Sequence, residues 1–256
     1  MNAKPQKTSM LNLARHLSTE KFLETVYNRP LRDRFTLGTC VLCGLRWDGY
    51  SQLCRGCTAD LPWANEACPR CARPLASGTL CGRCLGSPPP YQQTVATFDY
   101  RYPIDGLVKQ LKYAAKIDLA GLLGTSMSNK LRTCVTDYPQ CLIPVPLHHK
   151  RLMKRGFNQS MELARTVSRA FGIGVDPLCV KRKLDTQPQA GLPVSARRNN
   201  VRGAFSLTRH LNYKHVAIVD DVITSAWTVH ELAKLLVQAG VERIDVWVCC
   251  RAFPQR

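Results

Sequence analysis

Eight of the thirteen cysteines lie in one short block as four Cys-x-x-Cys pairs, a pattern that can bind metal. The pairs are Cys40 and Cys43, Cys54 and Cys57, Cys68 and Cys71, and Cys81 and Cys84. Thiolates bind zinc well, and a Cys-x-x-Cys turn brings two of them to one tetrahedral ion. The spacing repeats, with ten residues between the first two pairs and nine between the last two. The block therefore predicts two structural zinc ions, because four protein ligands leave no open coordination position for catalysis.

The spacing alone does not decide which cysteine pairs share an ion. Sequential pairing is the simplest arrangement, and a cross-braced arrangement stays open. A disulfide cluster is disfavoured in the cytosol. The other cysteines lie in apolar segments and are expected to be small buried side chains: Cys134, Cys141, Cys179, Cys249 and Cys250.

Two adjacent carboxylates, Asp220 and Asp221, directly follow the apolar run at 216–219. Three hydroxyl residues come next, Thr224, Ser225 and Thr228. Ligands of open α/β sheets bind outside the carboxyl ends of strands, where carboxylates can accept hydrogen bonds from sugar hydroxyls. A loop with free N–H groups at a helix N-terminus suits a phosphate. These residues predict a ribose-phosphate site; the competing interpretation is an ordinary helix N-cap.

The positive charge of the chain is concentrated in one segment. The 36 Lys and Arg exceed the 18 Asp and Glu, giving a net charge of +18. Residues 145–214 hold fourteen of these cations and three of the acids. Such a field favours polyanions. Lys150, Arg151 and Arg155 are candidates to contact pyrophosphate or the phosphates of DNA.

Aromatic residues near this charge could stack on nucleic-acid bases. The candidates are Phe157, Tyr213, Trp47 and Trp63. Core packing is the favoured interpretation of these side chains. No nucleophile and base can be paired from the sequence, but phosphoribosyl transfer can proceed by positioning and charge stabilisation.

An alternation of strands and helices must position these groups. Strands are expected at 94–100, 140–146, 174–180, 215–221 and 243–250, and helices at 104–114, 118–135, 157–172 and 229–240. This order predicts an α/β fold with a parallel sheet and helices on both faces. A helical extension is expected at 1–37, the zinc module at 38–87, and the α/β domain at 88–256.

Neither a membrane span nor a secretory signal can be identified. No stretch approaches the roughly 18–20 apolar residues of a membrane span. The first residues lack a long apolar core followed by a cleavage site. We therefore expect a cytoplasmic location.

Several segments resemble the ComF family of competence-associated and GntX-type DNA-utilisation proteins. The stretch at 216–228 is similar to the phosphoribosyl-pyrophosphate signature of type I phosphoribosyltransferases. The family elements are matched by RLMKRGFNQSMELA at 151–164, by TQPQAGLPVSARRNNVRGAF at 186–205, by FDYRYPIDGLVKQLKY at 98–113 and by the cysteine block. The resemblance covers roughly 38–252. It implies a type I phosphoribosyltransferase-like sheet preceded by a double zinc-ribbon-like module.

The resemblance also implies a function. It implies a DNA-uptake or DNA-utilisation accessory protein that binds single-stranded DNA and a phosphoribosyl ligand, for example phosphoribosyl pyrophosphate with Mg²⁺. Other DNA-uptake or DNA-processing proteins would be its partners. Two alternatives stay open: an active phosphoribosyltransferase of nucleotide metabolism, and a regulator that senses a phosphorylated ligand. The chain departs from the family at Ala226 and Trp227, where the phosphate loop usually has Gly and a small residue.

Overall fold

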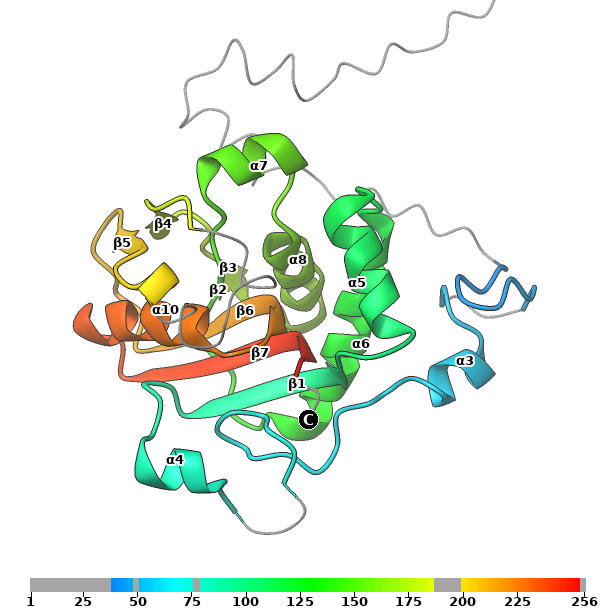
Figure 1. Cartoon of the computed structure of the whole chain (residues 1–256), viewed down its shortest axis with the longest axis horizontal. Helices are drawn as coiled ribbons and strands as arrows, with labels where there is room; N and C mark the ends of the chain where they lie inside the picture. The colour runs from blue at the N-terminus through cyan, green and yellow to red at the C-terminus, as the bar shows by residue number, and fades with distance from the viewer. Residues whose placement is uncertain (1–37, 48–50, 76–78, 187–198, 254–256) are drawn as a thin grey trace, which may run out of the picture.

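Five parallel strands form the central sheet of the chain in a computed structural model. The structure describes residues 38–47, 51–75, 79–186 and 199–253. The strands are β1 (Gln93–Asp99), β2 (Cys141–Pro144), β3 (Gly174–Val175), β6 (His215–Ile223) and β7 (Arg243–Arg251). They lie in the order β1-β7-β6-β2-β3 (Figure 1). The predicted parallel sheet is therefore confirmed.

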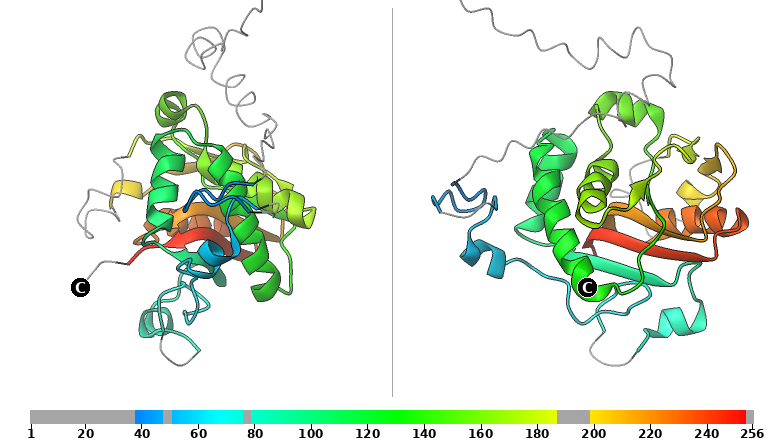
Figure 2. Two further views of the ribbon diagram at one scale, coloured as in Figure 1. Left: turned by 90° about the vertical axis from the view of Figure 1, so that its right-hand side faces the viewer. Right: turned by 180° about the vertical axis from the view of Figure 1, so that it is seen from behind.

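Alternate residues of the central strands pack on opposite faces of the sheet. Ala217 and Val219 of β6 face a core shared with three helices: α5 (Ile104–Tyr113), α6 (Asp118–Cys134) and α8 (Gln159–Phe171). Val216 and Ile218 face the core beneath α10 (Trp227–Gln238). The predicted cover of helices on both faces is confirmed (Figures 1 and 2). Such a fully covered sheet explains why β6 and β7 are almost continuously buried.

A second, two-stranded sheet lies outside the central one. It pairs β4 (Val180–Arg182) with β5 (Phe205–Leu207) in antiparallel orientation. The single strand expected at 174–180 is thus wrong, since the segment is split between β3 and β4. A turn separates them, in which the backbone N–H of Cys179 donates to Asp176 Oδ1 at 3.2 Å.

The cysteine block is attached to the free edge of β1. The backbone N–H of Ala64 donates to the carbonyl of Thr97 at 3.0 Å, and that of Asp99 to the carbonyl of Pro62 at 2.8 Å. The hydroxyl of Thr94 donates to the carbonyl of Arg70 at 2.7 Å. The short helices α3 (Arg55–Ala59) and α4 (Gly82–Gly86) lie apart, joined by the segment along β1 (Figures 1 and 2). The boundary expected at residue 87 stays a prediction.

Two further expectations concern single segments. The helix expected at 1–37 lies outside the described residues. The expectation that Cys134 is buried is wrong, because it is exposed at the end of α6; the other four cysteines outside the block are buried. Within the described ranges, no helix has the length and apolar character needed to cross a membrane.

Candidate functional site

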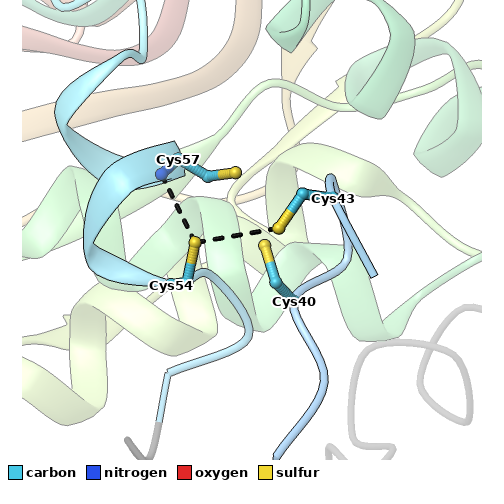
Figure 3. Close-up of side chains that lie close together, drawn as sticks. All are labelled: Cys40, Cys43, Cys54 and Cys57. Carbon is cyan, nitrogen blue, oxygen red and sulfur yellow. Dashed lines mark hydrogen bonds between the residues drawn. The ribbon is translucent and has the colours of Figure 1, made fainter. Parts of the chain in front are cut away.

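The eight cysteines of the block form two separate clusters. One consists of Cys40, Cys43, Cys54 and Cys57, the other of Cys68, Cys71, Cys81 and Cys84. Within each cluster, the Sγ atoms all lie within 4.8 Å of one another. Figure 3 shows the first set converging on one point. This geometry assigns sequential pairing, which the spacing alone left open.

Each cluster is built from the same two local structures. The first cysteine pair lies in a tight hairpin closed by a β-bridge, Thr39 to Arg46 in one cluster and Ala67 to Pro74 in the other. The residue after the hairpin's second cysteine has left-handed backbone, with φ of 72° at Gly44 and 51° at Ala72. The second cysteine pair starts a short helix, α3 or α4, with Cys54 or Cys81 at its N-cap. The two clusters are therefore a structural repeat.

The electrostatics of these clusters favour a bound cation. Burial opposes ionisation of Cys40 and Cys68, but hydrogen bonds from neighbouring backbone groups lower the pKa of Cys40 to about 6 and that of Cys68 to about 7. Hydrogen bonding to Cys43 and Cys54 raises the pKa of Cys57 to about 12. Thiolates this close repel one another unless a cation lies between them. Zn²⁺ supplies that charge, and its preferred tetrahedral sulfur ligands match the residues present.

A cleft of about 670 Å³ opens at the carboxyl ends of β2 and β6. Four elements or segments supply most of its walls: the C-terminal half of α5, the segment after β2, the start of α8, and the loop between β6 and α10. This is the position at which open α/β sheets bind ligands. The cleft is therefore the candidate ligand site of the α/β domain.

Both predicted acids line this cleft, and each already has protein partners. Asp220 Oδ1 accepts from the hydroxyl of Ser160 at 2.9 Å and from the backbone N–H of Asp221 at 2.9 Å. Asp221 Oδ2 lies 3.0 Å from Nζ of Lys112 on α5. Burial, and then the negative charge of Asp221, raise the pKa of Asp220 to about 7. Asp220 can thus change its charge near neutral pH.

Three arginines also line the cleft. Arg151 and Arg155, two of the three predicted phosphate contacts, belong to α7 (His149–Arg155). Arg182 comes from β4 and is 8% exposed. Burial, and then the nearby charge of Arg151, lower the pKa of Arg182 to about 10. Lys150 also lies on α7, but it is exposed and is not among the described residues that line the cleft.

The element after Arg155 positions the start of α8. Gly156 ends α7 with a left-handed φ of 81°, and Phe157 is buried in the core. Asn158 caps α8 by accepting from the N–H of Ser160 at 3.1 Å, and its amide donates to the carbonyl of Val145 at 3.0 Å. These contacts fix Ser160 beside Asp220.

The predicted hydroxyl residues are divided between two sides of one loop. Thr224 and Thr228 line the cleft, whereas Ser225 and Trp227 line a second pocket on the other side. Ala226 contributes to both pockets and has a left-handed φ of 67°. The cleft therefore collects two of the three hydroxyl residues, and the indole of Trp227 is not among its described walls.

The cleft contains three further residues that were not predicted as site residues: Lys112, Ser160 and Arg182. Lys112 and Ser160 lie within the family-like segments at 98–113 and 151–164, so the resemblance indicated the segments that hold them. Arg182 gave no such signal, because a lone arginine in a short strand is usually solvent-exposed.

The four aromatic candidates for stacking are packed within the protein. Phe157 is buried, and Trp63 packs on Phe98 with ring centroids 4.7 Å apart. The hydroxyl of Tyr213 donates to Asp176 at 3.3 Å, and the indole of Trp47 donates to the carbonyl of Ser51 at 3.1 Å. The favoured interpretation of core packing holds best for Phe157 and Trp63.

Comparisons with known proteins identify the cysteine block and show relatives over most of the chain. Residues 37–85 match the family model of the double zinc ribbon domain. The chain is 35% identical to the DNA utilization protein YhgH of Escherichia coli K12 over 222 residues, which are 84% of this chain and 98% of that protein. It is 38% identical to competence protein F of Haemophilus influenzae over 208 residues, covering 78% and 90% of the two chains. Competence protein ComFC of Bacillus subtilis is 21% identical over 74% of this chain and 79% of its own.

Proposed function

Because the chain belongs to the ComF family of competence and DNA utilization proteins, we propose that it binds single-stranded DNA through the cleft of its α/β domain. The names of its relatives support a role connected with DNA. The net charge of +18 supports binding to a polyanion. The double zinc ribbon has two four-cysteine clusters suited to two structural zinc ions, and its backbone is hydrogen-bonded to β1.

The observation that carries this proposal is the guanidinium of Arg182. It is 8% exposed, and its Nε has no hydrogen-bond partner within the described part of the chain. It donates to the hydroxyl of Thr186, a neutral group. Burial of a guanidinium with an unpaired N–H is unfavourable; Asp220 and Asp185 act on Arg182 through their charge, but its Nε still lacks an acceptor within the described part of the chain. A phosphate in the cleft would supply the missing acceptor and further negative charge.

Two tyrosines give the same cleft an aromatic wall. Tyr100 and Tyr113 both line it, and Tyr113 is 74% exposed. The guanidinium of Arg155 lies 5.7 Å from the ring centroid of Tyr113. Bases of a single strand stack on exposed aromatic rings whatever their sequence. The cleft therefore places arginines that can contact phosphates beside tyrosines on which bases can stack. This arrangement suits binding of single-stranded DNA without sequence preference.

Fluorescence anisotropy with a labelled oligothymidine across a salt series tests this proposal. Arg151→Ala combined with Arg155→Ala should weaken binding, and the slope of log K against log salt should fall by about 0.7 per lost phosphate contact. Lys150→Ala combined with Lys154→Ala is the matched control, because both lysines are exposed on the same helix and are not among the described walls of the cleft. Equal losses in the two double variants would show that the strand does not lie in the cleft.

A second candidate function is recognition of a phosphoribosyl ligand at the carboxyl end of β6. Asp220, Asp221, Thr224 and Thr228 support it, because carboxylates suit ribose hydroxyls and the loop suits a phosphate. Mg²⁺ would accompany phosphoribosyl pyrophosphate, whose charge it neutralises. Calorimetry with this ligand tests binding. Release of pyrophosphate in the presence of a nucleobase would distinguish an active transferase from a ligand-sensing regulator.

A further inference from the structure

A second, smaller pocket lies where the second zinc ribbon meets the loop after β6. We call it the seam pocket. Its volume is about 70 Å³, about one tenth of that of the cleft. Its described walls are Cys71, Arg73, Arg83, Cys84, Ser87, Pro89, Tyr91, Ser225, Ala226, Trp227, His230 and Arg251. It has room for one small polar group but not for a nucleoside.

Three arginines and no described carboxylate line this pocket. Arg251, from the end of β7, is 3% exposed, and its Nε has no hydrogen-bond partner among the described residues. Nη1 of the same guanidinium donates to the carbonyl of Thr224. Arg73 and Arg83 come from the second ribbon and are exposed. The buried guanidinium thus lies behind two solvent-accessible ones.

The structural repeat shows that these two arginines are not part of the ribbon fold itself. Arg73 follows Cys71 by two positions, where the first ribbon has Leu45 after Cys43. Arg83 precedes Cys84, where the first ribbon has Gly56. Both ribbons have the same local fold, but these two positions are charged only in the second ribbon, which faces the loop after β6. The ribbon fold therefore does not require these two arginines.

The zinc centre accounts for part of this charge. Four thiolates around Zn²⁺ carry a net charge of −2, and Cys71 and Cys84 belong to the walls of the pocket. Three guanidinium groups exceed that charge by one. A cluster of guanidinium groups of which one is buried is stabilised by an anion with several acceptor oxygens.

We propose that the seam pocket binds a phosphate group, and specifically a phosphodiester of the single strand whose binding in the cleft is proposed above. The loop from Thr224 to Thr228 is the wall shared by the cleft and the seam pocket. Phosphates in the two sites would lie on opposite sides of that loop. One nucleic-acid strand carries phosphates to both places, whereas a free phosphate fills only one. In this arrangement Trp227 belongs to the seam, where its ring centroid lies 5.7 Å from Cζ of Arg83.

The test compares Arg73→Gln with Arg83→Gln, singly and together, in the full zinc-loaded chain. We expect the double variant to bind a labelled oligothymidine at least about tenfold more weakly, with a salt slope lower by about 0.7 for one lost phosphate. Arg55→Gln is the matched control, because it removes the same charge from the first ribbon, and it should change affinity less than twofold. Arg83→Lys should retain most of the slope, since slope reports charge.

Two additional measurements separate the possible sources and causes. Inorganic phosphate should displace the oligonucleotide from wild type only at concentrations far above that of the oligonucleotide. Displacement at similar concentrations would show that the seam pocket binds free phosphate, and it would overturn the proposal. Zinc content should stay near two ions in every variant. Loss of zinc from a variant whose DNA affinity is unchanged would show that the arginines support the metal centre, and it would also overturn the proposal.

Two outcomes separate this proposal from the proposed function. If wild type binds no single-stranded DNA, the proposed function itself fails. If wild type binds and the double variant has the same affinity as Arg55→Gln, the seam proposal alone fails.

Discussion

Nζ of Lys112 lies 3.0 Å from Oδ2 of Asp221 and joins α5 to the carboxyl end of β6. Asp221 is almost fully buried, and Lys112 is one-fifth exposed. Burial opposes the charge of Lys112, but Asp221 raises the pKa of that ammonium above its ordinary value. The pair therefore keeps Lys112 charged at the wall of the cleft.

Removing Lys112 should leave the buried carboxylate of Asp221 without its counter-charge. Lys112→Met is expected to lower the free energy of unfolding by about 1.5–3 kcal/mol, the range for a charged hydrogen bond. Urea titration at pH 7.5 measures the change. Lys109→Met is the control, because Lys109 pairs with Asp105 on the exposed side of the same helix, and exposed pairs contribute little. Similar losses in both variants would contradict the importance of the buried pair.

Stability should decrease as the pH rises towards neutral because of Asp220. Burial and the charge of Asp221 raise its pKa in the folded state to about 7, above the value near 3.9 expected when unfolded. Between these pH values the folded state binds more protons than the unfolded state, so the free energy of unfolding falls as pH increases. The stabilising contribution is complete below about pH 4 and is lost as the pH passes about 7.

Comparison of wild type with Asp220→Asn at pH 5, 6, 7 and 8 checks this. The variant should show a flatter dependence on pH over this window and should exceed wild type in stability at pH 8. Asp118→Asn removes a carboxylate from the exposed start of α6 and should reproduce the wild-type curve in shape. A wild-type curve that rises from pH 5 to 8 with Asp220→Asn parallel to it would show that Asp220 ionises at its ordinary pKa.

The two zinc ions should leave the protein at different rates. All four cysteines of the second cluster are buried, whereas Cys43 of the first is exposed and Cys57 is half-buried. A chelator reaches an exposed ligand set first. We expect two phases of zinc release, the slower of which is lost in Cys68→Ser and the faster in Cys43→Ser. A metal-sensitive dye follows the release, and total zinc near two ions per wild-type chain is the required starting point.

The sequence predicted what depends on local pattern and left open what depends on distant contacts. Cys-x-x-Cys spacing was enough to predict two zinc sites, because each site is built from two short turns. Asp220 and Asp221 line a cleft at the carboxyl end of β6, because their position after an apolar strand fixes the sheet edge on which they lie; their role toward a ligand stays a prediction. Lys112 and Arg182 reach that edge from α5 and β4, and only tertiary packing brings them there. The sequence marked Trp227 only as a departure from the family, because the rotation of a residue about a turn decides which side of a loop it faces, and that rotation cannot be read from the sequence.

Ala226 should be a site at which glycine stabilises the protein. Its φ of 67° lies in the left-handed region, which is unfavourable by roughly 1–2 kcal/mol for a residue with a Cβ. The greater conformational freedom of glycine in the unfolded chain offsets part of this stabilisation. Ala226→Gly should therefore raise the free energy of unfolding by about 0.5–1 kcal/mol. Ala239→Gly is the control at the other end of α10, where φ is −84°, and it should destabilise. Thermal unfolding of both variants decides the sign.

The side of the loop on which each hydroxyl lies predicts how substitutions affect a phosphoribosyl ligand. Thr224 and Thr228 line the cleft, and Ser225 lines the seam pocket. Thr224→Val and Thr228→Val should each weaken phosphoribosyl pyrophosphate roughly two- to tenfold, because a neutral hydrogen bond contributes about 0.5–1.5 kcal/mol. Ser225→Ala removes a hydroxyl from the same loop and should leave this affinity unchanged. Calorimetry on the three variants compares them directly. If Ser225→Ala weakens the ligand as much as the threonine variants do, the phosphate lies on the seam side of the loop, and the division of this loop between two sites is wrong.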